Sequence, residues 1–143
     1  MARIEWGKQL SIGIDSVDNQ HKTLINYIND LDDAINKDIS AQAKKELISI
    51  VINKLVNYTK VHFVYEEAVV FKFSSYPEAE NHREIHEKVF KGVELFKNRI
   101  QTEDIDVLGS DLMIFLTQWI TNHILKEDMK YADYIKENGI KIN

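Results

Sequence analysis

Five histidines and two carboxylates in this chain have the residue types and the spacing of a metal site. The seven residues are His21, His62, Glu66, His82, His86, His123 and Asp128, and the chain has no other histidine. Residues four apart lie on the same face of an α-helix, and this is the spacing of both His62 with Glu66 and His82 with His86. Imidazole and carboxylate together suit iron, manganese or zinc. The sequence therefore predicts a metal site built by several helices.

Histidines on apolar helix faces also occur as core residues without metal and as ligands of a single zinc ion. A lone histidine in such a place is usually a hydrogen-bonded core residue. Burying five imidazoles and two carboxylates without metal, however, would cost several kcal/mol. A single zinc ion would use three or four of these ligands and strand the others in the core. The full set therefore favours two metals over no metal or one zinc.

A count of coordination positions predicts an open site. Two octahedral metals need about twelve positions, and five imidazoles, two bridging carboxylates and one bridging oxygen fill about eleven. The remaining position would take an external ligand. Ferritin-like oxidases use four carboxylates and two Glu-x-x-His pairs, whereas this set has only two acids. Fewer anionic ligands should stabilise highly oxidised iron less well, which favours reversible O₂ binding over oxygen activation.

Four helices are predicted to hold these residues. One proline and five glycines argue against an all-β fold, and apolar residues recur every three or four positions in four stretches. The predicted helices span about 18–37, 41–73, 78–101 and 106–128, after an N-terminal arm (1–17) and before a C-terminal segment (129–143). Asp18 is a candidate N-cap of the first helix, and Asp38 and Ser40 are candidates at the start of the second. The expected fold is one all-α domain.

Short links between the helices predict an up-down-up-down antiparallel four-helix bundle with an extended arm. His62 and Glu66 lie late in the second helix, and His82 and His86 lie early in the third. Because two consecutive antiparallel helices form a hairpin, the end of the second helix lies beside the start of the third. His21, early in the first helix, and His123, late in the fourth, fall at the same end. The topology therefore predicts that all seven residues converge.

Composition narrows the function classes further. The net charge of −5 argues against a nucleic-acid partner, which would need a basic face. The absence of cysteine excludes disulfides, thiolate zinc sites and iron–sulfur clusters. No stretch approaches the ~20 apolar residues of a membrane span, and the first residues do not resemble a signal peptide. We expect a soluble cytoplasmic protein with no membrane partner.

Four segments resemble the motifs of bacteriohemerythrins, the prokaryotic branch of the hemerythrin family. They are Gly13–His21, His62–Glu67, Tyr76–His86 and Trp119–Asp128, and the resemblance covers nearly the whole chain. It implies a non-enzymatic protein that binds O₂ reversibly at a non-heme di-iron centre, for storage, delivery or scavenging. The alternative is sensing of O₂, NO or redox state, or a peroxidase-like activity, at the same site.

The resemblance also implies a role for each residue. One iron would take His82, His86 and His123, and the other would take His21 and His62 and keep the open position. Glu66, Asp128 and an oxo or hydroxo group would bridge the two irons. We expect Ile120, one turn before His123, to line the O₂ pocket. Three weaker candidates for the pocket wall are Trp119, Phe63 and Ile25.

Two features depart from a simple match. The stretch from Glu66 to Tyr76 is one residue longer than the usual family spacing. A bulge in the helix could absorb the extra residue and tilt the wall of the pocket, but we favour the turn at Ser74 and Ser75. Asp128 follows His123 by five residues, which on a regular helix rotates it about 140° from the histidine. The regular choice would be Glu127. Assigning Asp128 therefore predicts a π-bulge in this segment, with Glu127 and Glu67 as solvated neighbours of the ligands.

Overall fold

Helices make up nearly all of the regular structure in residues 4–141, which are the residues that the computed structural model describes. The four long helices are α1 (Asp15–Ile35), α2 (Ala41–Tyr65), α4 (Ala79–Arg99) and α5 (Ile105–Asn122). The shorter elements are η1 (Lys8–Leu10), η2 (Glu66–Val70), α3 (Phe71–Ser74), η3 (His123–Asp128) and α6 (Met129–Glu137). No β-strand occurs in this range, which confirms the predicted all-α class.

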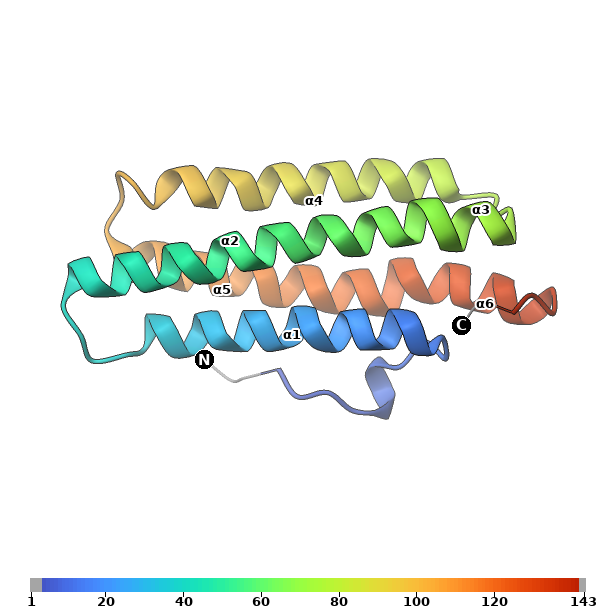
Figure 1. The fold of residues 1–143 in the computed structure, drawn as a ribbon, viewed down its shortest axis with the longest axis horizontal. Helices are drawn as coiled ribbons and strands as arrows, with labels where there is room; N and C mark the ends of the chain where they lie inside the picture. Colours follow the sequence, from blue (N-terminus) through green and yellow to red (C-terminus); the bar gives the residue numbers. More distant parts are fainter. Residues whose placement is uncertain (1–3, 142–143) are drawn as a thin grey trace.

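The long helices form an antiparallel four-helix bundle (Figure 1). Helix α1 packs against α2 and α5, and α4 packs against the same two helices, so the four surround one core. Elements α2, η2 and α3 follow one another as one continuous helical rod, and α5, η3 and α6 as another. With α1 and α4, they make the four rods of the bundle. The fourth rod therefore continues for nine residues beyond its predicted end at 128. None of the helices within residues 4–141 is long and apolar enough to cross a membrane.

Apolar stripes on the four helices supply the core. Leu24, Ile28 and Leu31 of α1 are fully buried, as is Leu116 of α5. Burying one such side chain contributes about 1.5–3 kcal/mol relative to exposing it. Helices α1 and α5 approach closely at Gly109, where a Cβ would lie 2.9 Å from Cγ2 of Ile35. Close packing of this kind gives the helices a fixed register, which a site shared by four helices requires.

The helix starts agree only in part with the predicted caps. Ser40 caps α2, since its side chain accepts a hydrogen bond from the backbone N–H of Ala43. The prediction for Asp18 is wrong, because α1 begins three residues earlier, at Asp15. Asp18 instead lies in the first turn, and its carboxylate accepts hydrogen bonds from Ile12 N, at 2.9 Å, and from the Ser11 hydroxyl. It holds the arm to the helix.

From residue 4 onward, the N-terminal arm packs along α1. The Asn29 side chain forms two hydrogen bonds with the backbone of Ile4, at 3.0 Å to its N–H and 2.8 Å to its carbonyl oxygen. The ammonium of Lys22 lies 5.3 Å from the centre of the Trp6 ring, within the range of a cation–π contact. The arm therefore braces the helix that carries His21.

The irregularity after Glu66 lies in the helix and not in the turn. Residues Glu66–Val70 are π-helical, and the N–H of Phe71 bonds to the carbonyl of Glu66, five residues back. A π segment accommodates one extra residue while the helix continues. Ser75, with φ of 53°, then ends α3 in the left-handed region. The expectation that Ser74 and Ser75 absorb the extra residue is therefore wrong.

Candidate metal centre

The seven residues singled out by their spacing converge inside one end of the bundle. They come from all four rods, and each is at most 2% exposed to solvent. Their ligand atoms form two overlapping groups, within each of which all atoms lie within 4.8 Å of one another. The groups are Glu66, His82, His86, His123 and Asp128, and His21, His62, His123 and Asp128. The predicted convergence is thus present in the structure.

Asp128 lies between the two sets of histidines. Its Oδ1 is 2.9 Å from Nε2 of His82, and its Oδ2 is 2.7 Å from Nε2 of His21. The same Oδ2 is 2.9 Å from Nε2 of His123. The two oxygens of this carboxylate therefore face histidines of different groups, which is the arrangement that a carboxylate bridging two ions requires.

Glu66 occupies an equivalent position on the opposite rod. Its Oε1 lies 3.0 Å from Nε2 of His86 and 3.1 Å from Nε2 of His62. His62 precedes Glu66 by one helical turn, and this spacing places both on the inner face of the α2 rod. Both carboxylates thus reach histidines of both groups.

A π-helical segment explains how Asp128 reaches the cluster. Element η3 spans His123–Asp128, and the N–H of Met129 bonds to the carbonyl of Ile124, five residues back. The wider turn rotates Asp128 inward, where it is fully buried. Glu127 instead forms an ion pair with Lys130 at 3.7 Å and keeps 23% of its side chain exposed. The prediction of a local irregularity between His123 and Asp128 is confirmed.

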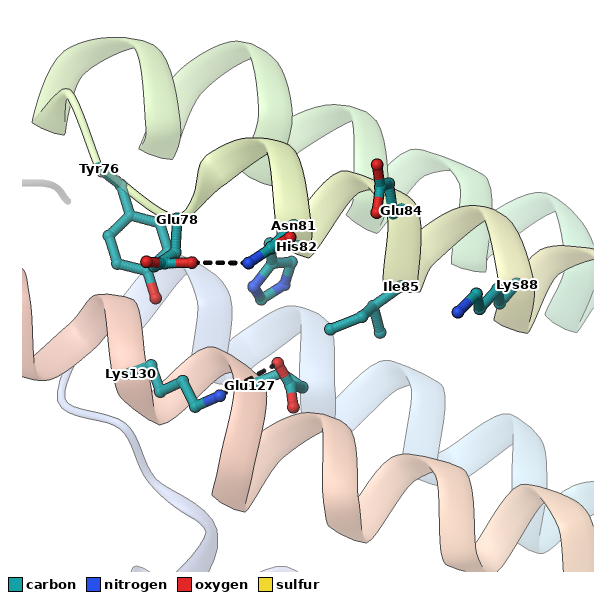
Figure 2. Close-up of a pocket in the computed structure, with 9 residues that line it drawn as sticks. All are labelled: Tyr76, Glu78, Asn81, His82, Glu84, Ile85, Lys88, Glu127 and Lys130. Carbon is teal, nitrogen blue, oxygen red and sulfur yellow. Dashed lines mark hydrogen bonds and ion pairs between the residues drawn. The ribbon is translucent and has the colours of Figure 1, made fainter.

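Surface pockets lead toward one half of the cluster. Figure 2 shows a pocket beside α4 that is lined by His82, Glu127, Lys130 and the hydrogen-bonded pair Glu78 and Asn81. Two further pockets, one on each side of α4, reach His86 and His123. These three histidines therefore lie just beneath the molecular surface.

Comparisons with known proteins agree with this geometry. The profile of the family described as "Hemerythrin HHE cation binding domain" matches residues 12–135. The chain belongs to the hemerythrin family. It is 36% identical over 141 residues to a bacteriohemerythrin of Pseudomonas aeruginosa (strain LESB58), covering 96% of this chain and 85% of the relative. Identity is 34% over 137 residues to a bacteriohemerythrin of Stenotrophomonas maltophilia (strain R551-3), covering 95% and 84%. A hemerythrin-like protein of Naegleria gruberi is 31% identical over 126 residues, covering 88% of each chain.

Unsatisfied polar atoms in this hemerythrin centre fit a metal. Among residues 4–141, neither oxygen of Glu66 has a hydrogen-bond partner, and neither does Oδ1 of Asp128 or Nε2 of His82 and His86. These atoms are close together without being aligned as hydrogen bonds. A buried polar atom left unpaired costs about 1–3 kcal/mol. Coordination to metal ions within the cluster would satisfy these atoms, so the residues fit the non-heme iron of the family.

The charges of the hemerythrin cluster stabilise one another in the metal-free state. Burial disfavours the charged form of His123, but Asp128 and Glu66 outweigh it and raise the pKa of His123 to about 10. For His62, burial again opposes protonation, and Glu66 and Asp128 raise its pKa. Burial raises the pKa of a carboxyl group, yet the nearby imidazoles hold the pKa values of Glu66 and Asp128 well below their usual range.

Aromatic residues form part of the wall of the hemerythrin site. The Phe63 ring stacks on His86 with centroids 3.8 Å apart and planes 4° apart, and the Trp119 ring lies 5.6 Å from His123. Both were expected near the O₂ pocket. Ile25 and Ile120 are buried in the core, and their place at the pocket remains a prediction.

Three residues of the hemerythrin site were missed or misjudged from the sequence. Oε1 of Gln20 lies 2.6 Å from Nδ1 of His62. Oε2 of Glu67 lies 2.9 Å from Nδ1 of His86, so the expectation that Glu67 is merely solvated is wrong. Tyr131 is fully buried, with its ring 5.6 Å from His82. Gln20 and Glu67 each adjoin a ligand in sequence, a signal that could have prompted a search for outer hydrogen-bond partners.

Proposed function

We propose that this chain binds O₂ reversibly at a non-heme di-iron centre and acts in oxygen storage, delivery or scavenging. The observation that carries the proposal is the pair of overlapping ligand groups, which share His123 and Asp128 inside the bundle. Family membership and the relatives named bacteriohemerythrin support the choice of iron and of O₂. We propose a binding protein and not an enzyme.

We assign His82, His86 and His123 to one iron and His21 and His62 to the other. Glu66 and Asp128 would bridge the ions together with an oxo or hydroxo group. The positions of the Asp128 oxygens, which face His82 and His21, support this division. The iron with only two histidines would keep the open position for O₂.

The residues around the centre would favour binding over further reaction. Two ferrous ions, when bound, supply the electrons that hold O₂ reversibly. The Phe63 ring is buried and lies 5.9 Å from the His62 ring, so it would help to keep water from the open position and protect a bound oxygen molecule from displacement. Five imidazoles and two carboxylates give the centre less negative charge than the four-carboxylate oxidases have.

A gas-exchange experiment tests this proposal. The protein is loaded with ferrous iron without air, O₂ is admitted, and the visible spectrum and iron content are recorded. We expect two irons per chain and an O₂-dependent absorption band that disappears when O₂ is removed. Rapid irreversible conversion to the ferric form would contradict storage and favour sensing or peroxidase-like chemistry.

Metal uptake is expected to depend steeply on pH. In the metal-free state the pKa of about 10 keeps the His123 imidazole protonated at neutral pH, and the two carboxylates also raise the pKa of His62. A metal binds only the neutral imidazole, so binding must displace the proton of His123 and becomes tighter as pH rises toward 10. Glu66 and Asp128 are already ionised and release none.

Calorimetry with zinc, which is redox-inert, measures this effect. The apparent affinity should rise by roughly tenfold per pH unit for each proton displaced. Titrations between pH 6 and pH 8 in buffers of different ionisation enthalpy give the number of protons released. An affinity that is flat over this range would contradict the charge distribution described for the metal-free cluster.

A further inference from the structure

We infer that Glu67, held in place by Arg83, is a positioning residue that orients His86 and makes the three-histidine half of the centre the tighter metal site. This inference rests on the proposed function, since it concerns the same two ions. The ion pair between Glu67 and Arg83 thereby gains a role in the centre. Glu67 directly follows Glu66, the proposed bridging carboxylate.

The geometry fixes both oxygens of Glu67. Oε2 accepts a hydrogen bond from Nδ1 of His86 at 2.9 Å, and Oε1 accepts one from Nε of Arg83, also at 2.9 Å. Arg83 is itself bonded to Glu80 at 2.6 Å. A hydrogen on Nδ1 leaves the lone pair of His86 on Nε2, the nitrogen that faces the cluster. The chain of contacts therefore selects the ring orientation and tautomer that a metal ligand needs.

His86 is held on a second side as well. The Phe63 ring stacks on it in a nearly parallel arrangement, so the imidazole is restrained at one edge and one face. The ion pair between Glu67 and Arg83 is partly exposed, with 26% and 39% of the two side chains accessible. Exposed pairs of this kind contribute little to stability. The main effect of the ion pair between Glu67 and Arg83 is therefore to place the His86 ring.

The other histidines are supported differently. His62 donates from Nδ1 to the neutral amide oxygen of Gln20. Nδ1 of His21 and Nδ1 of His123 have no hydrogen-bond partner within the described part of the chain. An anionic acceptor raises the basicity of an imidazole ligand more than a neutral amide does. The His86 side of the centre should therefore donate more strongly to its metal than the side that carries His62.

Single substitutions in the zinc-loaded 143-residue chain test this inference. Glu67→Gln keeps the shape of the side chain and turns the partner of His86 into an amide, like that of His62. Glu87→Gln is the matched control, because Glu87 adjoins His86, is exposed, lines the same pocket as Glu67 and loses the same charge. Gln20→Glu is the reciprocal change at His62.

The readouts are competition with a chelator and the NMR signal of the His86 Nδ1 proton. In Glu67→Gln we expect one of two zinc ions to bind about tenfold more weakly, with the other unchanged. The proton signal should shift with Glu67→Gln and stay in place with Glu87→Gln. Gln20→Glu should tighten the second ion.

Two outcomes would overturn the inference in different ways. Equal weakening in Glu67→Gln and Glu87→Gln, or no weakening in either, would remove the positioning role while the two-ion centre stands. An unmodified protein that holds fewer than two zinc ions would instead contradict the proposed centre itself. Because Glu67→Gln is isosteric and lies on a partly exposed surface, comparable circular dichroism of the variants is expected.

Discussion

Replacing Asp128 with alanine is expected to remove the two-ion centre. After ferrous loading and gel filtration, the purified variant should carry one iron per chain or none, whereas we expect the unmodified protein to carry two. Asp128 is the residue whose two oxygens face His82 and His21, and it also contacts His123. Its loss would leave those imidazoles without the carboxylate that joins the two groups. Iron analysis by mass spectrometry measures the result.

Glu127 provides the matched control for this substitution. It precedes Asp128 by one residue, is also acidic, and is turned toward Lys130 at the surface. Glu127→Gln should therefore retain both ions. If Glu127→Gln lost iron and Asp128→Ala kept it, the ligand would be the residue that a regular helix favours, and the inward rotation of Asp128 by η3 would have no role in metal binding.

Removing the metals is expected to lower the melting temperature by more than roughly 10 °C. Five buried atoms of Glu66, Asp128, His82 and His86 lack hydrogen-bond partners within residues 4–141, and bound ions would satisfy them. An ion present at about 1,000 times its dissociation constant adds roughly 4 kcal/mol to the free energy of unfolding. For a domain between the small and the larger size classes, each kcal/mol shifts the melting temperature by about 4 °C.

Thermal unfolding followed by circular dichroism compares the zinc-loaded protein with the same sample after chelation. Adding zinc back should restore the higher melting temperature. The Asp128→Ala variant supplies the control, because zinc should shift its melting temperature far less. An unchanged melting temperature on metal removal would mean that the cluster is satisfied without an ion and that its histidines are ordinary core residues.

Much of the site could be predicted because helical spacing and hairpin order are properties of the sequence. His62 with Glu66 and His82 with His86 share helix faces by periodicity alone, and short links then bring those faces to one end. The inward position of Asp128 was also predictable, but only through a conflict between its assignment as a ligand and its five-residue spacing from His123. Its spacing from His123 fits no regular helix, and the π segment that resolves the conflict is present.

Other features depend on tertiary contacts that spacing does not encode. Asp18 has the residue type of an N-cap, but contacts with Ser11 and Ile12 place it inside the helix as an anchor for the arm. The role of Glu67 depends on Arg83 and on His86, which lie on a different rod. The irregularity after Glu66 was expected in the turn at Ser74 and Ser75, whereas the alternative, a bulge within the helix, is what the structure has.

Anomalous diffraction at the iron edge from crystals of the iron-loaded protein tests the di-iron centre most directly. We expect two iron peaks in each chain, one in bonding distance of His82, His86 and His123 and the other of His21 and His62. Glu66 and Asp128 should lie between the two peaks. A single peak, or a second iron bound by Glu127 in place of Asp128, would contradict a two-iron centre bridged by these carboxylates.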